Sequence, residues 1–237
     1  MTRYNSSKYR VEPTAKVLNS TENVNKLISL VCNETVEKIG EIFYGKNEKK
    51  LKPKKEHLLK TIDHVCEKTY KVSKDNTERI AYIKLNESKA KDLIEKNYNT
   101  LPAKAWYILE GHSCPDLYIE CKNHIILCEG KWTESNITTK TTYISRRNQM
   151  ARHIQGALNQ TSKKIIAFYI VDANCSYTKN LTKEAFKSQL ESESICLDKT
   201  EKQQILSSFY GYTTWQEISK AFPQITFLSK TEIDSQK

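Results

Sequence analysis

The sequence predicts an α/β protein in which a sheet and its flanking helices carry helical additions at both ends. Three observations predict this class. Apolar residues recur at helical spacing through most of the first hundred residues, short segments rich in aromatic and β-branched residues follow Pro102, and a continuous apolar run ends at Ala173. A chain of 237 residues is long enough for one substantial core, so one main domain is expected.

The first hundred residues are predicted to be helical. Two amphipathic helices are indicated by apolar residues three and four apart: Val24, Leu27, Ile28, Val31, Ile39, Ile42 and Phe43 after Thr21, then Leu58, Leu59, Ile62, Val65 and Cys66. The lysine-rich segment between them, residues 46–55, contains Pro53 and is expected to be a solvated linker. A third helix is predicted from about Asn86 to Asn97.

After Pro102 the pattern becomes typical of strands. Residues 105–111, 115–121 and 124–132 are short, apolar and separated by turn signals, which predicts a three-stranded antiparallel meander. A helix over 145–160 and a buried strand over 163–173 should follow.

These elements divide the chain into three regions. Residues 86–173 form the predicted core, in the order helix, three strands, helix, strand. Residues 1–85 are a helical N-terminal region, and residues 174–237 are an accessory region packed on the core. In the accessory region, helices are predicted near 182–190 and 200–209, and Thr213 or Thr214 should cap a helix that begins near Trp215.

The charge of the chain indicates a class of partner. Lys and Arg outnumber Asp and Glu by 38 to 28, which gives a net charge of +10 and favours a polyanion such as nucleic acid. A lysine-rich surface without a specific partner is the alternative. No apolar run approaches the roughly 18 residues that cross a bilayer, so we expect a soluble intracellular protein of the cytoplasm or nucleus, without a membrane partner.

The segment CPDLYIECKNHIILCEGKW, residues 114–132, places charged side chains in two predicted strands. If residues 121–124 close a hairpin with a two-residue turn, Asp116 and Glu129 lie directly opposite each other. Lys131 emerges on the same face, because strand side chains alternate. The other face should carry Leu117, Ile119, Ile126 and Cys128.

Two facing carboxylates repel each other by about 0.2–1 kcal/mol unless a cation lies between them. Hard oxygen donors suit Mg²⁺, with Mn²⁺ as a substitute, and the lysine is able to orient or deprotonate an attacking water. The alternative is a cross-strand salt bridge between Lys131 and the two acids at the edge of the sheet.

Pro115-Asp116 and Glu129-Gly130-Lys131 resemble the motif of the PD-(D/E)XK, or restriction-endonuclease-like, nuclease superfamily. The core of that family has the order of elements predicted for residues 86–173. The resemblance implies that Asp116 and Glu129 bind the metal with the backbone carbonyl of Gly130, and that Lys131 serves the water. It implies hydrolysis of phosphodiester bonds that leaves 5′-phosphates.

Many members of the family add a carboxylate from the first core helix. Glu95 is the candidate here, with Glu87 and Glu67 as alternatives. Members that resemble RecB nucleases carry a glutamine on the helix after the motif, which Gln149 matches. His153 stands where those proteins usually have tyrosine.

Basic residues near this helix are candidates for binding nucleic acid. Gln149, Arg152 and Gly156 share one helix face, where the glycine would let a phosphate backbone approach. Lys140, Arg146 and Arg147 lie in a polar segment that suits the same role. The alternatives are an ordinary solvated helix face and a flexible surface loop.

The predicted function is therefore that of a metal-dependent DNA endonuclease, in restriction or in repair and recombination. A homodimer would suit cleavage of double-stranded DNA, because a two-fold axis presents one site to each strand. The alternatives are a catalytically idle nuclease-like module that binds nucleic acid, and a structural protein.

Overall fold

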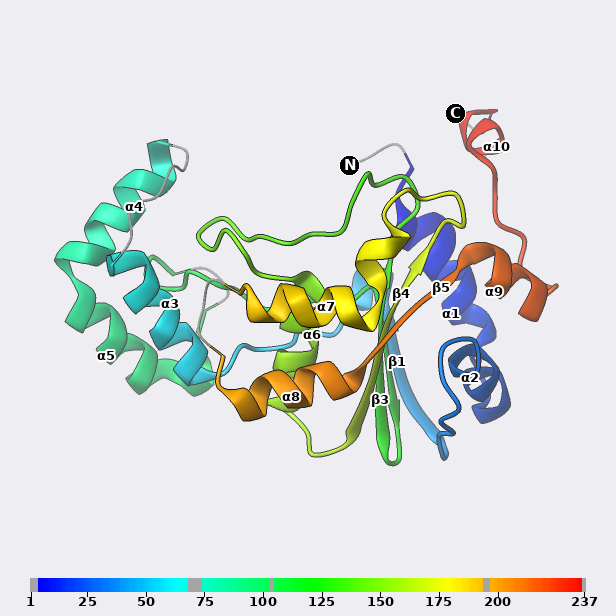
Figure 1. Cartoon of the computed structure of the whole chain (residues 1–237), viewed down its shortest axis with the longest axis horizontal. Coiled ribbons are helices and arrows are strands. Elements are labelled where there is room, and N and C mark those ends of the chain that lie inside the picture. The colour runs from blue at the N-terminus through cyan, green and yellow to red at the C-terminus, as the bar shows by residue number, and fades with distance from the viewer. Residues whose placement is uncertain (1–3, 68–73, 103–104, 194–196, 236–237) are drawn as a thin grey trace.

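The computed structural model describes residues 4–67, 74–102, 105–193 and 197–235 and has an α/β fold with a five-stranded mixed sheet (Figure 1). The strands, in their order across the sheet, are β1 (Ile39–Tyr44), β2 (Leu117–Cys121), β3 (His124–Gly130), β4 (Lys164–Val171) and β5 (Phe209–Thr214). The first three are antiparallel, whereas β4 runs parallel to β3 and β5 parallel to β4. Helices make both parallel crossovers, which a short turn cannot do.

The helices lie around this sheet and beyond it. Their bounds are α1 (Glu12–Val17), α2 (Thr21–Ile28), α3 (Lys55–Glu67), α4 (Lys74–Leu85), α5 (Glu87–Asn97), α6 (Gln149–Leu158), α7 (Lys183–Glu191), α8 (Lys199–Ser208), α9 (Trp215–Ala221) and α10 (Lys230–Ser235), with shorter turns η1 (Ser7–Val11), η2 (Gly45–Asn47), η3 (Tyr98–Thr100) and η4 (Thr178–Leu181). Across the described ranges, no helix has both the length and the apolar character needed to span a membrane.

Each face of the sheet is covered by its own helices (Figure 1). Leu127 and Tyr169 belong to the core beneath α6, α7 and α8, whereas Ile126 and Phe168 belong to the core beneath α1, α2 and α9. Neighbouring residues of one strand therefore enter opposite cores, as the alternation of strand side chains requires.

A helical unit of α3, α4 and α5 lies to one side of the sheet, away from α9 (Figure 1). In the chain it is inserted between β1 and β2. Its core includes Ile62, Ile83 and Ile94, and it also takes in residues 107–109 and Tyr143. Most of the predicted N-terminal helices thus belong to an insertion.

The strand predicted at residues 105–111 is wrong. This segment is an irregular connection whose apolar residues 107–109 pack into the helical unit. The first antiparallel strand is instead β1, which was predicted to be helical. The spacing of Ile39 and Ile42 fits a helix face, but it also fits β1, because the pairing with β2 shifts register between these two residues.

Most other predicted elements are confirmed. The β2–β3 hairpin has the predicted register, in which Leu117 pairs with Cys128 and Ile119 with Ile126. Thr214 caps α9 in a capping box with Glu217, as predicted for Thr213 or Thr214. The predictions at 86–97, 145–160, 163–173, 182–190 and 200–209 correspond to α5, α6, β4, α7 and α8. The strand β5 was not predicted.

Candidate active site

The hairpin brings two carboxyl groups together where β3 ends. Because Leu117 pairs with Cys128, the next positions outward are Asp116 and Glu129. The backbone N–H of Gly130 donates to Asp116 Oδ2 at 2.9 Å. Glu129 is buried, with 3% of its surface exposed, whereas Asp116 is half-buried. The pair therefore lies between the core and the solvent.

Three side chains hold the Glu129 carboxylate. Lys131 Nζ lies 2.9 Å and Gln149 Nε2 lies 2.6 Å from Oε1, and His153 Nε2 lies 3.1 Å from Oε2. Gln149 and His153 are four residues apart on α6, so one face of this helix presents both to β3. Lys131 also donates to Gln149 Oε1 at 3.3 Å, which closes the network.

The charges in this network are unevenly compensated. Burial acts to raise the pKa of Glu129, but the charge of Lys131 and the hydrogen bond from His153 outweigh it and hold that pKa at about 2. Burial and the neighbouring Glu129 raise the pKa of Asp116 well above its usual value. Lys131 thus compensates one carboxylate well and leaves the other in a negative field.

Glu48 is a third acidic residue beside the pair, and sequence reasoning missed it. Tyr44 pairs with Leu117, and Leu51 forms a bridge with Ser113, so the loop that contains Glu48 faces residues 114–116. Its carboxylate has no hydrogen bond or ion pair within the described residues. Burial and the charge of Glu129 raise the pKa of Glu48. Only the pairing of two segments distant in sequence reveals this position.

The floor of the site is rigid. Lys131 N–H donates to Ile170 O, and Trp215 Nε1–H donates to Lys131 O, each at 2.8 Å. A Cβ at Gly130 would lie 2.7 Å from Val11 and 3.1 Å from Trp215, so glycine lets β3 pass beneath both. Trp215 therefore packs in the core and supports the motif strand.

Two predicted site residues have other surroundings than expected. Gln149 is predicted to contact nucleic acid, but its side chain donates a hydrogen bond to Glu129 and accepts one from Lys131. Glu95 is exposed on α5, and Figure 1 shows this helix in the helical unit, to one side of the sheet whose strand β3 carries Glu129. The carboxylate that approaches the pair comes instead from the loop after β1.

Lys140 and Arg152 line one groove of about 550 Å³. Its other lining residues include Thr138, Thr141 and Thr142, and also Glu110, whose Oε1 lies 3.4 Å from Arg152 Nε. Arg152 belongs to α6, which also carries the two side chains that hold Glu129. One helix, α6, therefore contributes both to the groove and to the contacts of Glu129.

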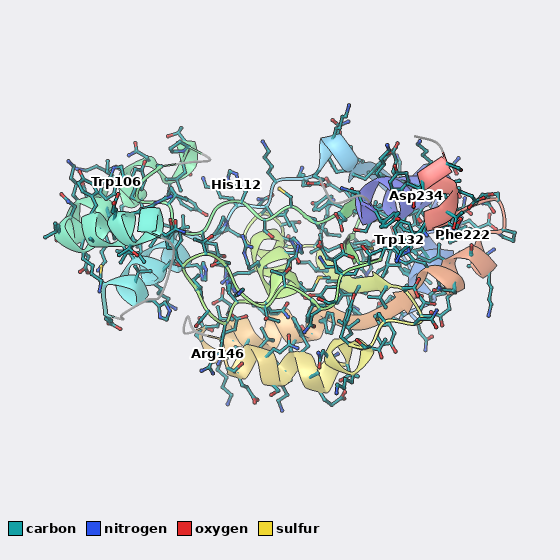
Figure 2. The ribbon with its side chains drawn as sticks, turned by 90° about the horizontal axis from the view of Figure 1, so that it is seen from above. Trp106, His112, Trp132, Arg146, Phe222 and Asp234 are labelled. Carbon is teal, nitrogen blue, oxygen red and sulfur yellow. The ribbon has the colours of Figure 1, made fainter. Side chains whose placement is uncertain are left out.

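The structure contradicts the role predicted for Arg147. Its guanidinium is buried and pairs with Glu110, with Nη2 at 2.9 Å from Oε1 and Nε at 3.1 Å from Oε2. A side chain with 1% exposure does not reach a nucleic acid. Arg146 is exposed, and Figure 2 shows it well apart from Trp132, which directly follows Lys131.

Gly156 also has a different role from the one predicted. It is buried, and a Cβ there would lie 2.8 Å from Cβ of Leu51. The glycine therefore admits the chain near Leu51 against α6, and it does not face a phosphate backbone.

The donor atoms at the strand end suit a hard cation. Within the described part of the chain, no group of three or more His, Cys, Asp or Glu side chains is already placed to hold a metal ion. Asp116 Oδ1 nevertheless has no hydrogen-bond partner there, and the repulsion that raises the pKa of Asp116 is what a divalent cation would relieve. The two carboxylates and the Gly130 carbonyl fit Mg²⁺ better than they fit a soft metal.

Comparisons with known proteins give no further assignment. The chain matches no protein-family model, no curated protein and no solved structure.

Proposed function

We propose that the chain is a metal-dependent nuclease with a restriction-endonuclease-like core, and that it hydrolyses phosphodiester bonds in DNA to leave 5′-phosphates. The observation that carries the proposal is the meeting of Asp116 and the Glu129-Gly130-Lys131 segment at one end of a hairpin. Two carboxylates and an amine converge there, an arrangement that suits a divalent cation and an oriented water in phosphodiester hydrolysis.

The topology supports the same proposal with revised boundaries. Helices α1 and α2 precede β1, the strands β1 to β3 are antiparallel, and α6 leads to β4, which is parallel to β3. This order agrees with the one that the resemblance implies if residues 45–116, which include the helical unit, are taken as an insertion. The proposed core therefore begins near the N-terminus.

Asp116, Glu129 and the carbonyl of Gly130 would hold the Mg²⁺, which supplies a polarised phosphate and an acidified water. Lys131 would orient that water, because its amine lies on the same carboxylate, 2.9 Å from Oε1. Gln149 donates to that oxygen as well and limits the motion of both groups. The side chains thus orient the reactants before they meet.

The groove beside α6 provides a path for the substrate. Lys140 and Arg152 would contact phosphates, and the threonine hydroxyls would donate to phosphate oxygens. The net charge of +10 supports electrostatic attraction of DNA. Lys140→Ala should weaken binding of duplex DNA and reduce the slope of log affinity against log salt by about one, as measured by fluorescence anisotropy.

Cleavage assays test the proposal directly. Supercoiled plasmid, linear duplex and single-stranded DNA are incubated with Mg²⁺, Mn²⁺ or EDTA, using the wild type, Asp116→Ala and Lys131→Ala. Lys122→Ala is the matched control, because this exposed lysine lies at the opposite end of the hairpin and pairs with Glu37. Metal-dependent cutting that only the site variants lose supports the nuclease. Equal cutting by all variants overturns it.

One observation favours a second candidate, a nucleic-acid-binding module without catalysis. Lys131, Gln149 and His153 already satisfy the Glu129 carboxylate without a cation. Such a module would bind DNA with the salt dependence of a phosphate contact surface but would cut no substrate under any metal condition.

A further inference from the structure

His153 connects the Glu129 carboxylate to a serine outside its own helix. His153 Nε2 lies 3.1 Å from Glu129 Oε2, and its Nδ1 forms a hydrogen bond with Ser113 Oγ. Both side chains are buried, with His153 at 1% and Ser113 at 4% exposure. Each polar atom of the imidazole therefore has one fixed partner, and neither depends on water.

The position of Ser113 is fixed by a second contact with α6. Ser113 N–H donates to Leu51 O and Leu51 N–H donates to Ser113 O, each at 2.8 Å. Leu51 in turn lies against Gly156, where even a methyl group would be too close. The sequence of contacts from Gly156 through Leu51, Ser113 and His153 ends at Glu129.

The donor and acceptor roles along this chain of contacts follow from Glu129, at which it ends. An ionised Glu129 only accepts, so His153 must donate to it from Nε2. A neutral imidazole then accepts at Nδ1, which makes the Ser113 hydroxyl the donor. The carboxylate therefore selects the Nε2–H tautomer, and the serine hydroxyl satisfies the other ring nitrogen.

We propose that Ser113 and His153 are positioning residues that fix the orientation of Glu129, and that the Leu51–Ser113 bridge holds them against α6. The effect on metal binding rests on the proposed function, because it treats Glu129 as a ligand. The tautomer and the hydrogen bond from Ser113 do not rest on it. Partners of ligand side chains typically change metal affinity by about 10- to 100-fold when they are removed.

The first test measures the tautomer in the metal-free protein. Two-bond ¹H–¹⁵N correlation spectra at pH 8, with histidine labelled by ¹⁵N, should show the Nε2–H form for His153 in the wild type. Ser113→Ala should keep the Nε2–H form, because Glu129 still accepts from Nε2, but the ¹⁵N resonance of Nδ1 should move downfield when this nitrogen loses its hydrogen-bond donor. A wild-type Nδ1–H tautomer, or an Nδ1 resonance unchanged in Ser113→Ala, overturns the hydrogen-bond relay from Ser113 through His153 to Glu129. This holds whether or not the protein is a nuclease.

The second test measures Mn²⁺ affinity by calorimetric titration. His153→Ala and Ser113→Ala should weaken the Kd by about tenfold or more, and His153→Gln, which retains a donor near the Nε2 position, should recover part of the loss. His124→Gln is the matched control, because this buried histidine lies at the other end of β3 and should bind Mn²⁺ as the wild type does.

The two tests separate the possible failures. A wild type that binds no Mn²⁺ contradicts the proposed function, while the spectra still decide the relay. Mn²⁺ binding by the wild type with an unchanged Kd in His153→Ala overturns the positioning role and leaves the nuclease intact. Variants enter the comparison only with the near-UV circular dichroism of the wild type, so that loss of the fold is not counted as loss of the relay.

Discussion

Two buried glutamates, Glu110 and Glu129, have the same exposure of 3% and lowered pKa values, but different partners. Glu110 is contacted by Arg147, by Arg152 at 3.4 Å and by His57 at 3.2 Å. Glu129 has Lys131 and His153 but also lies beside Asp116 and Glu48. Glu110 directly contacts three basic groups, whereas Glu129 directly contacts two and has two further carboxylates beside it.

On the proposed function, the first cluster, around Glu110, stabilises the fold and the second, around Glu129, binds the metal. Burial acts to raise the pKa of Glu110, but Arg147 and His57 hold it well below its usual range. The cluster joins the helical unit to α6, because His57 belongs to α3 and Gln155 also contacts Arg147. At the other cluster, burial and the repulsion by Glu129 raise the pKa of Asp116, and local conflicts of this kind are common at functional sites.

Among the variants that test this comparison, Arg147→Ala should change the free energy of unfolding most. Arg147→Ala should lower the free energy of unfolding by about 3–5 kcal/mol, because it leaves Glu110 buried without its main partner. Urea denaturation followed by circular dichroism measures this. Arg146→Ala, at the exposed neighbouring position, is the control and should change stability by less than about 0.5 kcal/mol. Similar values for the two variants would contradict a stabilising role for the Glu110 cluster.

Glu193 gives the same cluster a pH dependence. Burial, opposed by Arg147, raises the pKa of Glu193 from 4.5 to about 7. The folded protein therefore retains a proton that the unfolded chain releases, and stability falls as the pH rises from 4.5 towards 7. Glu193→Gln should remove this loss, so its stability relative to the wild type should increase by up to about 3 kcal/mol between pH 5 and pH 8.

Urea denaturation at both pH values measures the effect. Glu191→Gln, at an exposed position two residues earlier, is the control and should follow the wild type. If the difference in the free energy of unfolding between Glu193→Gln and the wild type is the same at pH 5 and pH 8, the raised pKa of Glu193 is contradicted.

The support beneath the second cluster is tested at Gly130. Gly130→Ala should lower the free energy of unfolding by about 1–3 kcal/mol, because the added methyl group overlaps Val11 and Trp215. The backbone shift that relieves this overlap should also move Lys131 and reduce cleavage. Thermal denaturation and the plasmid assay measure the two effects. A variant that matches the wild type in both shows that the packing above Gly130 is loose.

The sequence was sufficient to predict the local structure around Glu129, namely the β2–β3 hairpin and the helix α6. The hairpin register, and with it the approach of Asp116 to Glu129, follows from alternation and a two-residue turn between residues 121 and 124. The helix α6 follows from its apolar face, although it begins at Gln149, after the cap residue Asn148, and not at residue 145 as predicted. These features depend on neighbours in the chain, and the pattern of residues records them.

The remaining features depend on contacts between distant segments. Arg147 was predicted to be exposed because its neighbours are polar, and only the arrival of Glu110, Glu193 and Gln155 explains its burial. Likewise, the approach of Glu48 requires the pairing of Leu51 with Ser113 across the insertion. Apolar spacing alone did not distinguish β1 from a helix, because a partner strand decides that choice.

The smallest expected effect is that of removing one negative charge from each cluster, which should change the free energy of unfolding in opposite directions. Asp116→Asn keeps an acceptor for the Gly130 N–H but removes the charge repelled by Glu129, so at pH 8 it should raise the free energy of unfolding by about 1 kcal/mol. Glu110→Gln should lower it, because Arg147 loses its ion pair. Mg²⁺ should raise the Tm of the wild type and leave that of Asp116→Asn unchanged, because binding to the folded state alone stabilises it. If both variants are destabilised and Mg²⁺ shifts neither the wild type nor Asp116→Asn, the Asp116–Glu129 pair is a structural ion cluster like that of Glu110.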